Sequence, residues 1–443
     1  MNQRFLIILA AVVGAQAQNS FSIHRLVSDI PGAADHVDAN LKNPWGLSAS
    51  GNSPFWISNN HTGTTTVYGS DGNSFPDPNP LVVTIPGPAG GASAPTGQTF
   101  NDIGSFELAP GKPALFLFCS EGGTIAGWNS SVSPSALTVV DNSGSRAVYK
   151  GIAVARTSDG PRLFVANFSA GTIDAFDGAF NPVPIPDDMR GPLAPGYSPF
   201  NIQRIGQRLY VAYAMRNDEG DDDVTGEGNG YICVFTLEGH LVARLTEGGA
   251  LNAPWGMAIA PEFFGPFSQT LLVANFGDGK INAYDTCSGQ WLGALADTDG
   301  KDLVLPGLWA LRAGNGHNGG ESGMLYFTAG LAGDGDVENH GLFGSIRPAP
   351  PTAAATAPPM PSSVAADIRD LRFTPDPINL PVGGSLTWTN RDGFAHTVKG
   401  DSAPFASGVL NQNATFTQTF DTPGTYDYHC TLHPFMRAKV VVQ

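Results

Sequence analysis

Short hydrophobic runs separated by glycine-rich turns dominate the chain from about residue 40 to residue 348. The unit is clearest in LFVANFSAGTIDAFD, which starts at Leu163, and in LLVANFGDGKINAYD, which starts at Leu271. In each copy an apolar run leads into an Asn-Phe-x-x-Gly turn, and a second run follows in which apolar and polar residues alternate. This pattern predicts two antiparallel strands joined by a tight turn.

The two-strand unit recurs with a period of roughly 50 residues. NPWGL at Asn43 returns as APWGM at Ala253, and weaker copies start near Pro95, Lys150, Ser198 and Pro306. Strand-rich repeats of this length with turn glycines are typical of propeller blades, and a β-sandwich is the alternative. We therefore predict an all-β chain in which residues 18–347 form a six-bladed β-propeller. The stretch Phe21–Val27 is expected to add a strand to the last blade.

Composition divides the chain further. After Arg347 the sequence reads PAPPTAAATAPPMPSS, which predicts an extended linker over residues 348–365. Residues 366–443 contain seven Asp against six Lys or Arg, a net charge of −1, so −15 of the total charge of −16 belongs to residues 1–365. This acidity argues against a nucleic-acid partner, because such partners require basic surface.

The first residues predict export. Arg4 precedes an apolar run over Phe5–Val13, and Ala15-Gln16-Ala17 is a cleavage signal, so residues 1–17 are expected to be a signal peptide cut after Ala17. The apolar run is too short to cross a bilayer, and no later segment has 18 consecutive apolar residues. We expect a periplasmic or secreted protein without a membrane span.

Residues 366–443 contain the strongest chemical signal. Five strands are expected there, and turn residues separate them, as in a small β-sandwich: Ile368–Phe373, Ser385–Asn390, Ala414–Phe420, Gly424–His429 and Arg437–Val442. Cys430, His433 and Met436 form a Cys-x2-His-x2-Met motif, and His396 lies upstream. His429 neighbours Cys430 on a strand, so its side chain should point to the opposite face.

One thiolate, two imidazoles and a thioether make up the trigonal site of blue copper proteins. The thiolate and the thioether suit Cu(I), and imidazole suits both oxidation states. Zinc is the alternative metal, but a thioether is a poor zinc ligand. The motif therefore predicts one mononuclear type 1 copper site.

The C-terminal segment resembles the cupredoxins, and specifically those of the amicyanin type, over nearly its whole length. The resemblance is carried by Phe373-Thr-Pro, Leu380-Pro-Val-Gly-Gly, the strand at Trp388 and GTYDYHC from Gly424. It implies that the copper ligands are His396, Cys430, His433 and Met436. It also implies that His433 is the electron port, with Pro434 and Phe435 beside it as an apolar docking patch. Thr397 departs from the family, where Asn commonly follows the first histidine.

The motif order of residues 20–348 is similar to that of a family of exported bacterial proteins that are expected to be propellers. NPWGLS at Asn43, the Leu271 repeat and GNGHNGG at Gly314 carry this resemblance. It implies a fold and a location but no activity.

Three further features are candidates for function. The acidic run Asp218–Asp223, with Glu227, has oxygen ligands that suit calcium, although its spacing is not that of an EF-hand, and a solvated insertion is the alternative. The loop of residues 314–320 carries His317. Cys119 and Cys233 fall in apolar strands and resemble buried thiols, and a disulfide within the set that includes Cys287 is left open.

The preferred interpretation is an exported blue copper protein that transfers single electrons, with the propeller as a docking or substrate-binding module. The acidic propeller would steer a basic redox partner such as a cytochrome, and a dehydrogenase is the other partner class. Two alternatives remain. The propeller is an oxidoreductase or a lyase-like enzyme that uses the copper domain as electron acceptor, or the chain is a copper-binding surface or adhesion protein.

Overall fold

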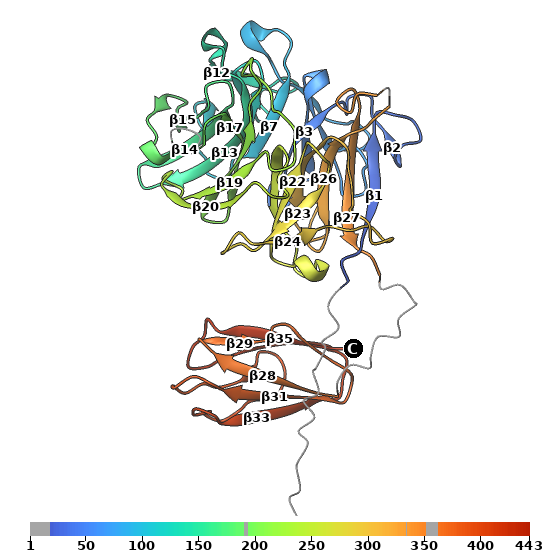
Figure 1. Ribbon diagram of the computed structural model, residues 1–443, viewed down its shortest axis with the longest axis vertical. Coiled ribbons are helices and arrows are strands. Elements are labelled where there is room, and N and C mark those ends of the chain that lie inside the picture. Colours follow the sequence, from blue (N-terminus) through green and yellow to red (C-terminus); the bar gives the residue numbers. More distant parts are fainter. Residues whose placement is uncertain (1–17, 190–193, 334, 351–361) are drawn as a thin grey trace, which may run out of the picture. The chain divides into compact units, whose positions relative to one another are not determined.

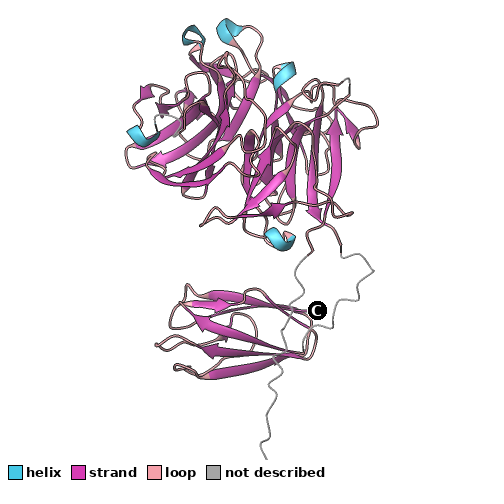
Figure 2. Ribbon diagram, viewed as in Figure 1, coloured by secondary structure: helices cyan, strands magenta, loops and turns pink. Residues whose placement is uncertain are grey.

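The structure is a computed structural model that describes residues 18–189, 194–333, 335–350 and 362–443. The predicted signal peptide and most of the predicted linker lie outside the described residues. The described residues divide into two compact units, one over residues 18–350 and the other over residues 362–443. Both are built from strands. The N-terminal unit also contains a few short 3-10 helices (Figure 2): η1 (Asn60–Thr62), η2 (Pro88–Gly90), η3 (Ser143–Ser145), η4 (Asp187–Met189) and η5 (Gly265–Phe267). Within the described residues, no helix has the length and apolar character that crossing a membrane requires.

The described part of the N-terminal unit contains six sheets of four or five strands, and each sheet is made mainly of strands that follow one another along the chain. The first three are β3 (Pro44–Ser48), β4 (Phe55–Asn59), β5 (Thr64–Tyr68) and β6 (Val82–Thr84); β7 (Pro95–Phe100), β10 (Phe116–Ser120), β11 (Thr124–Trp128) and β12 (Leu137–Asp141); and β13 (Tyr149–Thr157), β14 (Gly160–Asn167), β15 (Thr172–Asp177) and β16 (Pro182–Val183). A small hairpin, β8 (Glu107–Ala109) and β9 (Lys112–Pro113), lies between two strands of the second sheet.

The other three sheets follow the same plan. They are β17 (Tyr197–Ile205), β18 (Arg208–Met215), β19 (Tyr231–Phe235) and β20 (Leu241–Glu247); β21 (Pro254–Ile259), β22 (Leu271–Asn275), β23 (Ile281–Tyr284) and β24 (Trp291–Ala294); and β25 (Leu308–Ala313), β26 (Leu325–Gly330) and β27 (Gly341–Pro348), joined by β1 (Phe21–Ser28) and β2 (His36–Val37). β1 pairs antiparallel with β27, as expected, and this pairing brings the two ends of the unit together (Figure 1).

The first strands of consecutive sheets pack against one another. In the series β3, β7, β13, β17, β21 and β25, each strand contacts the next one, and β25 contacts β3. Glycine permits this approach: a Cβ on Gly46 would lie 2.6 Å from the carbonyl oxygen of Thr96, and one on Gly256 would lie 2.3 Å from that of Trp309. The Trp-Gly pairs of the repeat therefore place a bulky side chain beside a point of close backbone contact.

Burial within the sheets explains the sequence pattern. The second strands, such as β4, β10 and β22, are buried at every position because both of their faces are covered. The last strands, such as β24, are half-exposed. Burial therefore decreases from the inner strands to the outer strands of each sheet. This decrease explains why a continuous apolar run in the sequence is followed by a run in which apolar and polar residues alternate.

The C-terminal unit is a two-sheet sandwich, as expected. One sheet contains β28 (Ser363–Arg369), β29 (Arg372–Thr374), β31 (Gly384–Asn390) and β33 (Thr415–Phe420), and the other contains β30 (Ile378–Leu380), β32 (Lys399–Gly400), β34 (Gly424–His429) and β35 (Arg437–Val442). Trp388 and Tyr428 lie at the centre of its core. The bounds predicted for β34 and β35 are confirmed, whereas β28 begins at Ser363, inside the stretch that composition assigned to the linker. The single strand predicted over Ile368–Phe373 is wrong, because the chain turns at Asp370 and Leu371 between β28 and β29.

Candidate metal centre

Cys430 and His396 are held by the ends of strands in the C-terminal unit. Cys430 directly follows β34, and its side chain is fully buried. His396, also fully buried, lies in the loop after β31, where its backbone N–H and C=O pair with Leu410 at 3.0 and 2.8 Å. Asn390 at the end of β31 supports this loop, because its side-chain amide donates to the carbonyls of Phe394 and Leu410.

The segment Cys430–Met436 forms a tight turn between β34 and β35. The N–H of His433 donates to the carbonyl of Cys430 at 3.2 Å, and the N–H of Met436 donates to that of His433 at 2.9 Å. The N–H of Cys430 donates back to the carbonyl of Met436 at 3.1 Å. These bonds bring the two ends of the turn together, so the side chains of Cys430, His433 and Met436, three of the predicted ligands, project from one small loop.

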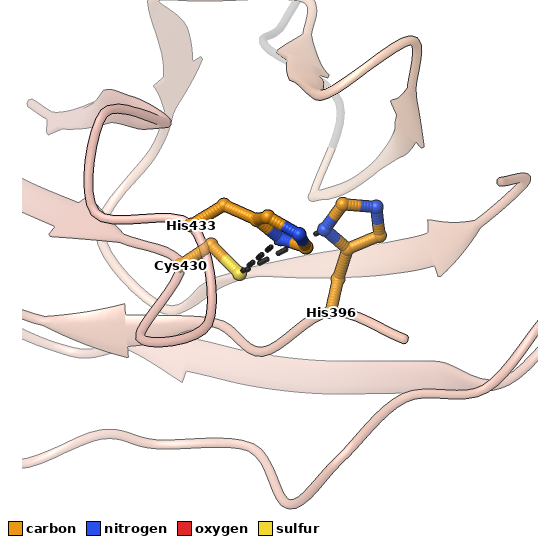
Figure 3. Close-up of side chains that lie close together, drawn as sticks. All are labelled: His396, Cys430 and His433. Atoms are coloured by element: carbon orange, nitrogen blue, oxygen red, sulfur yellow. Dashed lines mark hydrogen bonds between the residues drawn. The ribbon is translucent and has the colours of Figure 1, made fainter. Parts of the chain in front are cut away.

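The two histidine rings converge on the cysteine sulfur (Figure 3). The Nδ1 atom of His396 lies 3.7 Å from Cys430 Sγ, and that of His433 lies 3.6 Å from it. In the described part of the chain, this is the one group of three or more His, Cys, Asp or Glu residues whose ligand atoms lie within 4.8 Å of one another. Both rings present the same nitrogen to one buried point beside a sulfur.

Thr397 ties the two ligand loops together. Its backbone N–H lies 3.4 Å from Cys430 Sγ, and its hydroxyl lies 3.8 Å from the same sulfur. The hydroxyl also accepts from the N–H of Thr431 at 2.7 Å and bonds the Thr431 hydroxyl at 2.8 Å. Thr397 therefore links the loops through its hydroxyl, and its backbone supplies a hydrogen bond to the sulfur.

Asp392 orients the first histidine, a role that the sequence analysis missed. Its Oδ2 lies 2.8 Å from His396 Nε2, on the far side of the ring from the sulfur. Burial by itself raises the pKa of a carboxyl group, but N–H donors from Asp370 and Leu371, with the His396 ring, hold the pKa of Asp392 below its ordinary value. An anion facing Nε2 keeps a proton on that nitrogen and leaves Nδ1 free as a ligand atom. The Asp-x-x-x-His spacing is the signal that could have revealed it.

Met436 and His429 occupy different environments. Met436 is buried in the same core as Cys430, and its sulfur remains a predicted ligand. His429 lies outside the His–Cys–His group, as expected from strand alternation, and its Nδ1 pairs with Asp401, which also accepts from Arg437.

The second histidine lies at an apolar part of the surface. His433 is partly buried, and its ring centroid lies 5.9 Å from that of Phe394 and 6.1 Å from that of Phe435. Phe435 is 70% exposed, and Phe394 and Leu432 are about half exposed. Exposed aromatic residues therefore flank the ring that the resemblance names as the electron port.

The other candidate features of the sequence form no metal-binding group within the described residues. All four cysteines are free, and burial raises the pKa of the Cys119 and Cys233 thiols to about 12 each. His317 is exposed in its loop. Asp222 of the acidic run pairs with the buried Lys150 at 3.3 Å. The run supplies no group of three mutually close ligand atoms within the described residues, so calcium remains a prediction without structural support.

Comparisons with known proteins identify relatives of both units. Residues 361–443 match the model of the copper binding proteins of the plastocyanin/azurin family. An uncharacterised protein of Acanthamoeba polyphaga mimivirus is 36% identical over 342 residues, which cover 75% of this chain and 81% of the viral protein. The amicyanin of Paracoccus denitrificans is 37% identical over 91 residues, which cover 18% of this chain and 66% of that protein. A solved mutant of amicyanin in its Cu(I) form is 33% identical over 18% of this chain and 83% of its own, with a TM-score of 0.18.

The chain therefore belongs to the family of this mimivirus protein, and its C-terminal unit is a cupredoxin domain of the plastocyanin/azurin family. The bacterial origin and the export expected from the propeller motifs stay predictions.

Copper fits the residues that the structure brings together. Two neutral imidazole nitrogens and a thiolate at one buried point are the donor set that the plastocyanin/azurin family uses, and the N–H of Thr397 can bond the thiolate. The cofactor of this unit is a single copper ion.

Proposed function

We propose that the chain is an electron-transfer protein with one type 1 copper held by His396, Cys430, His433 and Met436. The observation that carries the proposal is the approach of both Nδ1 atoms to the buried Cys430 sulfur, at 3.7 and 3.6 Å. Copper supplies a one-electron couple when it is bound in such a site. The remaining chemistry belongs to the surrounding side chains.

The protein's part is to hold the donors still and to keep water away. Full burial of His396 and Cys430 excludes solvent from one side of the site. The Thr397–Thr431 bonds and the Asp392–His396 contact fix the donors from behind. A donor set that moves little between the two oxidation states lowers the reorganisation that each electron transfer requires.

Electrons would enter and leave through His433. Its partial exposure and the flanking Phe394 and Phe435 support this route. An exposed apolar surface suits transient contact with a redox protein, such as a cytochrome or a dehydrogenase.

For the N-terminal unit we infer a six-bladed propeller that serves as a docking or substrate-binding module. The six consecutive sheets and the cycle of contacts between their first strands support this inference. So does the pairing of β1 with β27, because a strand from the start of the chain that completes the last sheet is a common way to close such a ring. We also propose export to the periplasm or the medium, on the basis of the signal peptide predicted for residues 1–17.

Voltammetry of the copper-loaded full chain tests the proposed function. We expect a reversible one-electron wave that is absent from the apoprotein and from the Cys430→Ser variant. Copper that binds in equal stoichiometry without a reversible wave would favour the copper-binding surface protein over the electron carrier.

A further inference from the structure

A polar cavity of about 400 Å³ lies at one end of the first strands of the six sheets in the N-terminal unit. All six sheets contribute to its wall, through β3, β7, β13, β17, β21 and β25. Its lining includes the later residues of β3, β17 and β25, such as Ser48, Arg204 and Arg312. The volume lies within the range of small-molecule sites, which are commonly about 300 to 1,000 Å³.

Three residues of the wall bury a hydrogen-bond donor that has no acceptor. They are Ser48 through its hydroxyl, Trp255 through its indole N–H and Arg312 through Nε. Ser48 and Trp255 are more than nine-tenths buried. Tryptophan and arginine side chains can only donate, so water or a ligand with acceptor atoms is needed to satisfy them. Buried donors are rarely left without a partner in native proteins, which makes three around one cavity informative.

Arg312 carries a positive charge that forms no ion pair with a carboxylate of the described residues. Its Nη2 donates to the carbonyl of Ala49 at 2.7 Å, and this is the one hydrogen bond of the guanidinium to the described residues. Burial lowers the pKa of Arg312 to about 10, so the group is still protonated at neutral pH. The Arg312 side chain is partly buried. A cation that is withdrawn from water without a counter-charge is unfavourable, and a bound anion would relieve it.

The other charges of the wall cancel. Arg204 pairs with Asp102, and both line the cavity. Two arginines and one aspartate leave a net charge of +1 in this wall, in a chain whose net charge is −16. A local positive charge on an acidic protein favours an anionic ligand at this point.

We propose that this cavity binds a small oxyanion, the carboxylate or phosphate group of an organic molecule, with Arg312 as its charged contact. The guanidinium presents parallel N–H donors that match either group in a bidentate arrangement. The site is independent of the copper centre, and it gives the N-terminal unit a ligand class that the electron-transfer proposal does not contain.

Isothermal titration of the copper-loaded full chain with inorganic phosphate, and separately with citrate, tests this site. We expect one anion to bind per chain, with an affinity that falls about tenfold or more in Arg312→Gln, because a charge-assisted hydrogen bond is lost. The Arg312→Lys variant keeps the positive charge but loses the paired N–H donors of the guanidinium, so it should bind the anion with an intermediate affinity. Tighter binding of phosphate would indicate a phosphate ester as ligand, and tighter binding of citrate would indicate an organic acid.

Arg216→Gln is the matched control, because Arg216 also donates to a backbone carbonyl, that of Ser169, but lies outside the cavity. Its affinity for the anion should equal that of the unaltered chain. Equal affinity in Arg312→Gln with an unchanged circular dichroism spectrum, or no binding of either anion by the unaltered chain, would overturn the proposal. The visible copper band reports on the other unit, so failure of this site leaves the electron-transfer function to be judged separately.

Discussion

Thr397 shows how a single residue can replace a family preference without loss of its role. The cupredoxin pattern favours Asn after the first histidine, and the departure left the tie between the ligand loops uncertain from sequence. The structure places the Thr397 hydroxyl between the N–H and the hydroxyl of Thr431. The bond to the sulfur from the backbone N–H needs no particular side chain.

Replacement of Thr397 by Val should loosen the loops without removing a ligand. We expect copper affinity to fall by about 10- to 100-fold, as for other residues that support metal ligands. The reduction potential should also fall, because the hydroxyl that lies 3.8 Å from the Cys430 sulfur is lost, which leaves more electron density on the thiolate for the oxidised metal. Competitive chelation and voltammetry measure the two effects. Thr417→Val, which removes the Thr387–Thr417 bond of 2.7 Å elsewhere in the same unit, should change neither value.

Phe435 belongs to the proposed docking surface, and its side chain is 70% exposed. Phe435→Glu should slow electron exchange with a small cytochrome by about tenfold or more, because a desolvated aromatic contact is replaced by a charge. The visible band should stay unchanged. Val382→Glu is the control, because this exposed residue precedes the start of β31 while the site follows its end. An unchanged exchange rate in Phe435→Glu, measured by stopped flow, would exclude this face as the docking surface.

At the scale of the element, the sequence predicted most of the strands of the C-terminal unit. It did not predict the close contacts of the glycines in the N-terminal unit. Alternation marked β34 and β35 with the correct bounds. It missed β30 and β32, because strands of three and two residues are too short to show a period. The sequence also could not explain why glycine follows tryptophan in the repeat, because the close contact that requires glycine is made with a strand of the next sheet.

Gly256→Ala tests that reason. A methyl group there would lie 2.3 Å from the carbonyl oxygen of Trp309, and backbone must shift to admit it. We expect the free energy of unfolding of the N-terminal unit to fall by about 1 to 3 kcal/mol, the usual cost of overpacking. Gly323→Ala, where nothing lies within 4 Å of the added methyl, should leave the stability unchanged. Chemical denaturation followed by tryptophan fluorescence measures both, and equal stability of the two variants would contradict this account of the repeat.

At the scale of the whole molecule, the strong acidity has a buried component that composition could not locate. Burial, with the charge of Asp222 nearby, raises the pKa of Asp223 and of Glu338 to about 7 each. Both carboxyls interact electrostatically with the buried Lys150, which pairs with Glu121. Four carboxyls around one lysine leave more negative charge than the cation can neutralise.

This cluster predicts how stability depends on pH. The folded-state pKa of Asp223 and Glu338 is raised, so their contribution to stability is present below pH 4 and is lost as the pH rises through about 7. Glu121 has a lowered pKa and acts in the opposite direction, but only below its ordinary value of 4.5. The melting temperature of the N-terminal unit should therefore fall between pH 5 and pH 8.

Glu338→Gln should reduce that fall, because one group no longer ionises in the cluster. We expect a melting temperature about 1 to 3 °C above that of the unaltered chain at pH 8, and little difference at pH 5. Tryptophan fluorescence reports this unit, since every tryptophan except Trp388 lies in it. If the melting temperature of the variant depends on pH in the same way as that of the unaltered chain, ionisation of Glu338 does not destabilise the folded unit.

The visible absorption spectrum of the copper-loaded full chain tests the central claim most directly. The account predicts an intense thiolate-to-copper band that disappears on reduction, returns on oxidation and is absent from Cys430→Ser and His396→Ala, with circular dichroism showing that both variants fold. Protein that binds one equivalent of Cu(II) and stays colourless would contradict a type 1 copper site.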